Sequence, residues 1–159
     1  MVLPFTVCLA SFTVGCQTIP AADPLPPELA FLVRVNAAVN REGPPCPRDY
    51  CLDDWPRVAD LNRLDYWDCK AYAVAKADRL IRRHGYDPDR LEYLLVAGPP
   101  LRVTHAALLV DGRWVLDMGL RCQVCELEQF AAGVEIAGRL PVADLPYVHR
   151  ALHRQVSRP

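Results

Sequence analysis

The chain of 159 residues has the length of a single domain, and 52% of its residues are apolar, which suffices for a hydrophobic core. Its charges nearly cancel, to a formal net charge of −1, so the composition gives no indication of a nucleic-acid-binding protein. Seven cysteines and fifteen prolines are the unusual counts, and the prolines that gather in the first fifty residues predict irregular connections there.

The first sixteen residues have the pattern of an export signal. Residues 1–15 carry no charge, are mostly apolar and are too few to span a bilayer comfortably as a helix. Small residues precede Cys16, as at the processing site of a bacterial lipoprotein, although the run lacks a basic start and Thr13 stands where leucine is usual. We expect a protein of the periplasm or cell envelope, which either loses this leader or is lipid-anchored through Cys16, the alternative being a buried apolar segment.

This pattern divides the chain into three parts. Residues 1–16 form the leader, and residues 17–28 form a proline-rich tether, which is extended and semi-rigid. Residues 29–159 form one domain.

Helical spacing predicts three helices in this domain. The first runs from about residue 27 to 41 and ends at a Gly-Pro-Pro run, and a short one follows over residues 56–63. The third begins at Cys69, from which small or apolar residues recur on one face, and it ends at Gly85, a typical C-cap.

The start of the third helix can be capped by either of two aspartates, Asp65 or Asp68. Its basic residues, Lys76 among them, are expected mainly on the face away from Cys69.

Three strands are predicted after this helix, over residues 91–97, 103–110 and 113–118. The dipeptide Asp111-Gly112 is a hairpin signal between the last two. Because those two strands are apolar on both faces, we expect them inside a sheet that a helix covers on at least one side.

The cysteines outside the leader fall into two close pairs and one single residue. The pairs are Cys46 with Cys51 and Cys122 with Cys125, and Cys69 remains. In an exported protein such pairs predict disulfides, with three connectivities open to four cysteines. The alternative is a zinc site of four thiolates, which the same spacings allow.

A cysteine, a histidine and an aspartate are the polar residues that suggest chemistry. Cys69 opens a helix, whose N-terminus favours the thiolate, while His105 lies early in one predicted strand and Asp117 late in the next. An imidazole beside a thiol can form a thiolate–imidazolium pair, and a carboxylate can orient the ring. Each residue alone also has a structural explanation, as a buried small side chain, a core histidine and a strand-end aspartate.

The register of the hairpin decides whether His105 and Asp117 can meet. A two-residue turn at Asp111-Gly112 would send the two side chains to opposite faces of the sheet. A three-residue loop over residues 110–112 would place His105 directly opposite Asp117. We therefore predict an odd-length loop or a bulge, with the His105–Asp117 face covered by the helix of Cys69.

In order and spacing, these motifs resemble those of the bacterial transglutaminase-like cysteine proteinases, over about residues 29–120. The matching residues are Asp68-Cys69, Tyr72-Ala73, Lys76, Leu80, Gly85, His105-Ala106, Leu108-Leu109-Val110 and Leu116-Asp117. The resemblance implies an α+β fold of the papain/transglutaminase type, in which the nucleophile helix packs on a small antiparallel sheet. It also implies a thiol hydrolase of peptide or related amide bonds, with Cys69 as nucleophile, His105 as general base and acid, and Asp117 as the orienting carboxylate.

Some members of this family require calcium, and acidic residues just after their cysteine contribute to its binding. Here Lys70 and Ala71 stand at those positions, and a lysine is unfavourable beside a cation that needs several oxygen ligands. The resemblance leaves calcium open, but these two residues argue against it, and we expect no cofactor.

Other functions remain open at this stage. The same superfamily includes acyl transferases and cell-wall amidases, and a non-catalytic envelope lipoprotein stabilised by disulfides would share the leader and the cysteine pairs. The expected partner is a protein or peptide substrate in the cell envelope.

Trp67, two residues before Cys69, has two possible places. It either lines the active-site cleft, where its indole N–H could stabilise the oxyanion, or it packs in the core.

Overall fold

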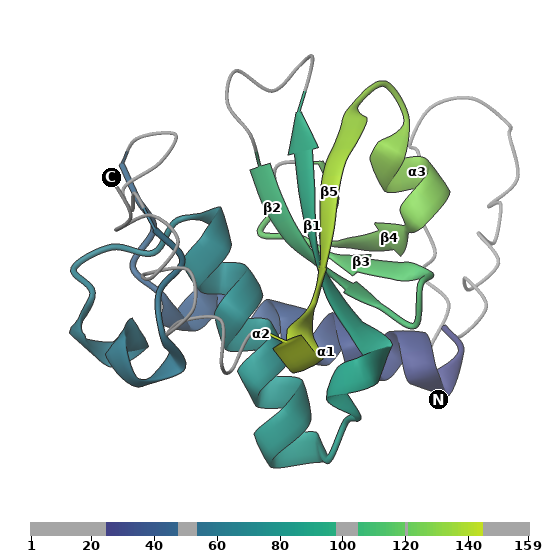
Figure 1. Ribbon diagram of the computed structural model, residues 1–159. Coiled ribbons are helices and arrows are strands. Elements are labelled where there is room, and N and C mark those ends of the chain that lie inside the picture. The colour runs from purple at the N-terminus through teal and green to yellow at the C-terminus, as the bar shows by residue number, and fades with distance from the viewer. Residues whose placement is uncertain (1–24, 48–53, 98–104, 120, 145–159) are drawn as a thin grey trace, which may run out of the picture.

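The computed structural model describes residues 25–47, 54–97, 105–119 and 121–144. They form an α+β fold in which an antiparallel sheet has the strand order β4-β3-β2-β1-β5 (Figure 1). Its strands are β1 (Leu91–Ala97), β2 (His105–Val110), β3 (Trp114–Leu116), β4 (Val124–Glu126) and β5 (Glu135–Pro141). The α-helices are α1 (Pro27–Glu42), α2 (Cys69–His84) and α3 (Leu127–Ala131), and 3-10 helices span Val58–Arg63, Pro88–Arg90 and Val142–Asp144.

Helix α1 agrees with the predicted helix at both ends. Proline stands at its first position, where a missing N–H costs nothing, and Gly43 follows its last turn in an extended conformation. Its buried side is made of Leu32, Val35, Asn36 and Val39.

Helix α2 also has the predicted ends. Asp68 is its N-cap, and Gly85 closes it with φ of 65°, a left-handed conformation that glycine adopts without strain. Asp65 is therefore not the cap. The helix is buried along most of its length, and the expectation that Lys76 lies on the outer face is wrong, because Lys76 is buried in the core.

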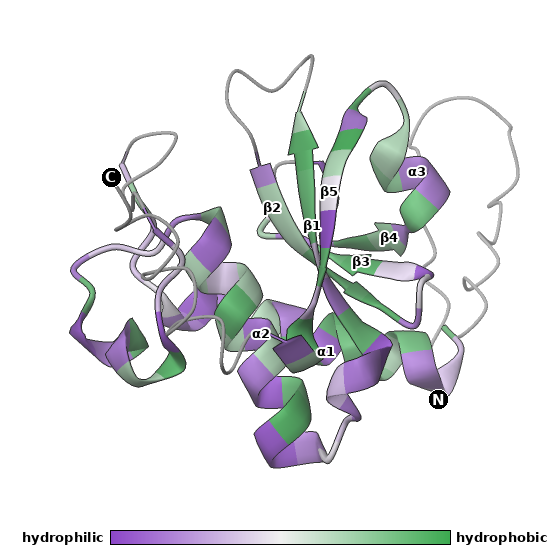
Figure 2. Ribbon diagram, in the orientation of Figure 1, coloured by the Kyte–Doolittle hydropathy of each residue, from purple (hydrophilic) through white to green (hydrophobic). Residues whose placement is uncertain are grey.

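The sheet separates two apolar clusters, and the apolar strands stand out in the middle of the molecule (Figure 2). Leu108, Val110 and Leu116 point to the side on which α1 and α2 pack. Ala107 and Leu109 point to the other side, toward α3. Because all six residues of β2 are buried, this strand is the centre of the fold, and each fully buried leucine contributes about 1.5–3 kcal/mol of transfer free energy.

The connection between β2 and β3 is a loop of odd length, as predicted. Val110 pairs with Trp114, so three residues lie between the strands, and Asp111 and Gly112 have φ of 56° and 64°. The Asp-Gly pair makes the tight turn, closed by the Arg113 N–H donating to the Val110 carbonyl at 3.0 Å, and Arg113 is the extra residue. The predicted pairing of Leu109 with position 113 is wrong, because the loop lies one residue further along the chain.

Three elements near the C-terminal end were not predicted. They are strand β4, which contains Cys125 of the disulfide with Cys122, and then helix α3 and strand β5. Strand β5 pairs with β1 at the sheet edge, and most of its residues are exposed or half-exposed. Over the described residues, no helix has the length and apolar character needed to cross a membrane.

The disulfide prediction is confirmed for one pair. Cys122 and Cys125 are bonded to each other, so neither thiol is available as a zinc ligand. Cys46 is also disulfide-bonded, and its expected partner Cys51 lies outside the described residues, as do the leader and most of the tether.

Candidate functional site

The start of α2 holds Cys69 in a fixed position. Asp68 Oδ1 accepts hydrogen bonds from the N–H groups of Lys70 (3.0 Å) and Ala71 (3.2 Å), which satisfies two of the free donors of the first turn. The Lys70 ammonium lies 3.3 Å from the other oxygen of this buried carboxylate. Cys69 is the first residue of the helix, is 8% exposed and carries a free thiol.

His105 and Asp117 form a buried pair. The Nε2 atom of His105 lies 2.6 Å from Oδ1 of Asp117, and the two residues are 2% and 0% exposed. Oδ1 also accepts the N–H of Met118 at 2.7 Å, and Oδ2 accepts the N–H of Arg121 at 3.0 Å. The carboxylate is thus satisfied on both oxygens, as a buried charge requires.

This geometry shifts the proton affinities of both partners. Burial alone would lower the pKa of His105, but hydrogen bonds and charge interactions with Asp117 and Cys69 outweigh it and raise the pKa to about 9. Burial alone would raise the pKa of Asp117, but the hydrogen bond and charge of His105, with the two backbone N–H groups, hold it below its usual value. His105 is therefore an imidazolium over a wide pH range.

The three residues singled out in the sequence are thus brought together. Because Nε2 of His105 faces Asp117, Nδ1 is the ring nitrogen that remains for the hydrogen bond with the Cys69 side chain. Both Cys69 and His105 are the first residues of their elements, so they meet where α2 and β2 begin.

One expectation about this arrangement is wrong. His105 pairs with Val96 and alternates with Ala107, so its side chain belongs to the sheet face opposite α2. Its ring centroid lies 6.5 Å from that of Phe130 on α3. Cys69 therefore reaches His105 at the end of the strand and not across the helix-covered face.

Two asparagines of α1 form hydrogen bonds with the backbone of Asp117 and of the segment after it. The Asn40 amide donates to the Asp117 carbonyl at 3.0 Å, and the Asn36 amide donates to the Gln123 carbonyl at 2.8 Å. The Asp117 N–H in turn donates to the Gln123 carbonyl at 3.0 Å. The sequence analysis gave neither asparagine a role, because these contacts depend on how α1 lies against the sheet.

Lys76 is a second residue whose position sequence reasoning missed. It is 1% exposed, and its ammonium lies 3.5 Å from the Leu116 carbonyl, next to Asp117, and 5.9 Å from the centre of the Tyr72 ring. Burial lowers its pKa to about 7, although the charge of Asp117 acts in the opposite direction. Its position seven residues after Cys69 places it on the same face of the helix, but lysine is among the residues least often buried, so the spacing alone did not predict its burial.

Trp67 is a core residue. Its side chain is buried, and its indole N–H donates to the Leu61 carbonyl at 3.1 Å, so that N–H is not directed at the thiol. The indole also packs edge-on against Tyr72 and against Gly43, where a Cβ would collide with the ring.

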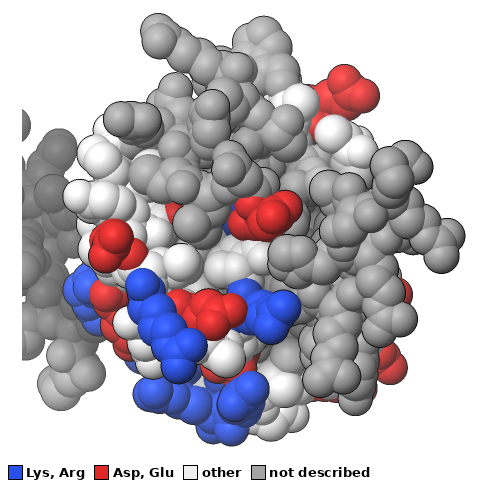
Figure 3. Space-filling view, turned by 60° about the vertical axis from the view of Figure 1, so that its left-hand side comes forward, with Lys and Arg blue, Asp and Glu red and all other residues white. Residues whose placement is uncertain are grey.

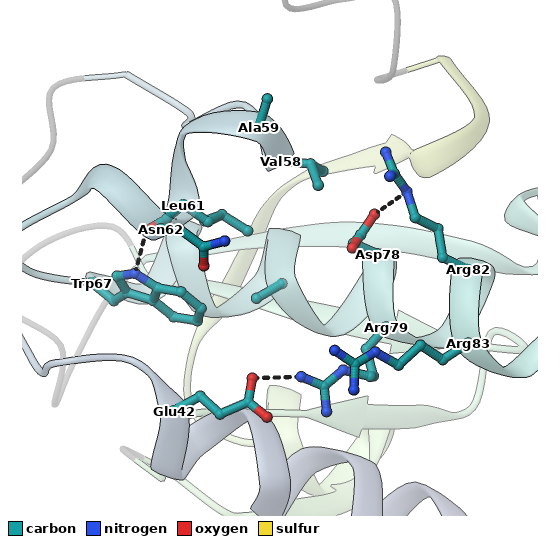
Figure 4. A pocket seen from close by; sticks show the side chains of 11 residues that line it. Glu42, Val58, Ala59, Leu61, Asn62, Trp67, Asp78, Arg79, Arg82 and Arg83 are labelled. Carbon is teal, nitrogen blue, oxygen red and sulfur yellow. Dashed lines mark hydrogen bonds and ion pairs between the residues drawn. The ribbon is translucent and has the colours of Figure 1, made fainter.

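A pocket of about 350 Å³ lies away from these three residues, beside the outer side of α2 (Figure 4). Trp67 and Leu61 form its apolar wall, and Arg79 pairs with Glu42 at its rim. On the face of the molecule turned forward in Figure 3, basic and acidic side chains are interspersed and do not form a patch of one sign. None of Cys69, His105 and Asp117 lines this pocket.

The residues near Cys69 do not fit a calcium ion. Lys70 places an ammonium against the Asp68 carboxylate, and the side chain of Ala71 has no ligand atom. Within the described ranges, no group of three or more histidine, cysteine or acidic side chains could hold a metal. Lys70 and Ala71 thus contribute no side-chain oxygen to a cation beside Cys69.

The comparisons with known proteins give a likeness of fold. No family model matches the chain, and no curated protein matches it in sequence. Among solved structures, the chain is similar to calcium-bound LapG of Legionella pneumophila, a transglutaminase-like cysteine protease, with a TM-score of 0.59 and 19% identity. The match covers 73% of this chain and 66% of LapG, just under two thirds of that protein's length. The chain therefore has an α+β fold with a papain-like architecture.

Proposed function

We propose that this protein is an exported thiol hydrolase that cleaves peptide or related amide bonds through Cys69, His105 and Asp117. The observation that carries the proposal is the buried chain of hydrogen bonds from the Cys69 thiol through the His105 ring to the Asp117 carboxylate. The likeness to LapG, a cysteine protease, supports the class of reaction. The leader pattern and the disulfides support the periplasm or cell envelope as its location.

The reaction begins with a thiolate that the imidazolium stabilises. The sulfur attacks the carbonyl carbon of the amide, and the carbonyl oxygen takes the negative charge. The Cys69 N–H, at the start of a helix whose first amides point outward, is the candidate donor to that oxygen. His105 then gives its proton to the leaving nitrogen, the C–N bond breaks, and a thioester to Cys69 remains.

Hydrolysis of the thioester returns the site to its starting state. His105, now neutral, takes a proton from water, the resulting hydroxide attacks the thioester carbonyl, and the C–S bond breaks. The acid leaves, and the thiolate–imidazolium pair is restored. Throughout, Asp117 holds the Nε2–H of His105 and offsets the positive charge on the ring.

The reactivity of Cys69 toward iodoacetamide tests this proposal. At pH 6 an ordinary thiol, with a pKa of about 8.5, is less than about 1% thiolate, whereas a thiolate–imidazolium pair is already ionised. We expect Cys69 in the folded protein to react at least about 10-fold faster than the same thiol in the unfolded chain. A His105→Ala variant should lose this advantage.

Equal rates in the folded and unfolded protein would contradict the proposal. With reactivity established, the substrate can be sought by comparing cell-envelope proteins in the presence of the wild type and of Cys69→Ser. A protein that stays intact only with the variant is the expected substrate. Addition of an amine to the reaction separates hydrolysis from acyl transfer, since only a transferase gives the amine conjugate.

A further inference from the structure

Lys76 is a buried charged residue for which the reaction described above has no use. It lies on α2 two turns after Cys69, is 1% exposed, and directs its ammonium at the Leu116 carbonyl, the peptide unit that carries Asp117. A buried ammonium is costly unless charges or hydrogen bonds compensate it, and methionine or leucine would fill the same space without that cost. The place of this lysine therefore calls for an explanation in terms of its charge.

The charges of the site suggest that explanation. In the reactive state, the thiolate of Cys69 and the carboxylate of Asp117 carry two negative charges, and the imidazolium of His105 carries one positive charge. The sum is one unbalanced negative charge in a buried place, and the Lys76 ammonium brings the sum to zero. The negative charge of Asp117 acts directly on Lys76, which supports the pairing.

Among the described residues, the other charges at the start of α2 are the Asp68 carboxylate and the Lys70 ammonium, which pair with each other at 3.3 Å, and β1 brings the buried phenol of Tyr93 to the same cluster. The buried side chains of α1 are apolar except for the neutral amide of Asn36, and that of the 3-10 helix Val58–Arg63 is Leu61. Strand β2 contributes Leu108 and Val110 beside His105. On α2 itself, the Tyr72 ring lies below the Lys76 ammonium.

We propose that Lys76 is a positioning residue, which holds the end of β3 through the Leu116 carbonyl and balances the charge of the Cys69–His105–Asp117 group. This inference rests on the proposed function, since it assigns Lys76 to the same site. If the inference holds, the Lys76 ammonium favours the thiolate of Cys69 at low pH, where Lys76 is protonated. This effect is lost when the pH rises above the Lys76 pKa of about 7.

Two substitutions separate charge from packing. In Lys76→Met the charge is gone at every pH, so the alkylation of Cys69 below pH 7 should be about 10-fold slower than in the wild type, while the loss of the imidazolium proton at high pH stays unchanged. In Lys76→Arg the charge persists at every pH, so the alkylation rate below pH 7 should stay unchanged. The imidazolium should then lose its proton about one unit earlier than in the wild type.

The measurement is the rate of Cys69 alkylation by iodoacetate from pH 4 to 10. The anionic reagent is favoured by the imidazolium, so its rate rises when the thiolate forms and falls when His105 loses its proton. Arg82→Met serves as the control, because it removes a cation from the same helix at a side chain that is 70% exposed and paired with Asp78. We expect its profile to coincide with that of the wild type.

The inference would be overturned if the pH profile of Cys69 alkylation were unchanged in both Lys76 variants and only their thermal stability were lower. Lys76 would then be a core residue only. If Lys76→Met does not fold, the high-pH transition of Lys76→Arg alone decides the question. The wild-type profile tests the proposed function separately. A wild type without enhanced alkylation contradicts the hydrolase, whereas an enhanced wild type with unaltered variants contradicts the role of Lys76 alone.

Discussion

Both carboxylate oxygens of Asp117 accept hydrogen bonds, and this determines what an amide would do in their place. Oδ1 takes the bonds from His105 and from the Met118 N–H, while Oδ2 takes the bond from the Arg121 N–H. An asparagine can offer an oxygen at only one of these places. Its NH₂ group would face either the Arg121 N–H or the imidazole donor, and a buried donor left without an acceptor costs about 1–3 kcal/mol.

Asp117→Asn should therefore affect both stability and reactivity. We expect a lower melting temperature, a pKa of His105 that falls from about 9, and a loss of about 100-fold or more in turnover, because an amide stabilises an imidazolium poorly. The checks are calorimetry, NMR titration of the His105 ring, and cleavage of the substrate. Asp54→Asn, at an exposed position, is the control, and full activity of Asp117→Asn would remove Asp117 from the site.

The buried Lys76 predicts a pH dependence of stability whose sign can be worked out. Burial lowers its pKa from 10.5 to about 7, so between these values the unfolded chain binds a proton that the folded chain does not. The contribution of Lys76 to the free energy of unfolding therefore rises with pH over this window, by about 1.4 kcal/mol per pH unit, and is constant below it.

Comparison with Lys76→Met isolates this term, because His105 and Asp117 are present in both proteins. The wild type should gain stability relative to the variant as the pH rises from 7 to 10, by urea denaturation at each pH. Below pH 7 the variant should be at its most stable relative to the wild type. A difference between the two proteins that does not change with pH would show that Lys76 titrates normally in the folded state.

At the scale of the element, the start of α2 depends on one side chain. The Asp68 carboxylate caps two N–H groups of the turn that carries Cys69, and it is buried. Asp68→Ala should cost about 1–2 kcal/mol in free energy of unfolding and should also slow the alkylation of Cys69, since the first turn frays. Asp68→Asn keeps an oxygen cap and should cost clearly less.

Urea denaturation of the two variants decides between the cap and the ion pair. Equal losses in both would assign the stabilisation to the charge interaction of Asp68 with Lys70, which is partly exposed to solvent.

The elements that could be predicted have a pattern of buried apolar residues and clear start or stop residues at their ends. The prediction for β1 has the observed bounds, and α1 and α2 follow from their helical spacing and from the glycines that end them. Strand β5 was not predicted, because it lies at the edge of the sheet, is mostly exposed and contains Gly138 and Pro141. Strand β4 and helix α3 are too short for a periodic signal.

At the scale of the whole molecule, the site combines residues from distant parts of the chain. Cys69, His105 and Asp117 could be predicted from their residue types, their order and the parity of the hairpin. The burial of Lys76 could not, because lysine is among the residues least often buried, and composition assigns it to the surface. The contacts of Asn36 and Asn40 with the segment after Asp117 could not either, since they depend on how α1 lies against the sheet.

Among the described residues, disulfides leave one cysteine as a free thiol. Cys122 is bonded to Cys125, Cys46 is also disulfide-bonded, and Cys69 is free. The expected partner of Cys46 is Cys51. A chain that begins after the leader therefore contains five cysteines, of which one should remain a thiol.

This predicts the result of a thiol titration on the protein purified from an oxidising compartment without reductant. After unfolding in guanidinium we expect one reactive thiol per chain, and none in Cys69→Ala. Digestion without reduction should release one peptide pair that joins Cys46 to Cys51 and one peptide that contains the closed loop of Cys122 and Cys125. Three thiols would show that one pair is open. Five thiols together with bound zinc would replace the disulfides by a metal site, and with them the argument for export that rests on the cysteines.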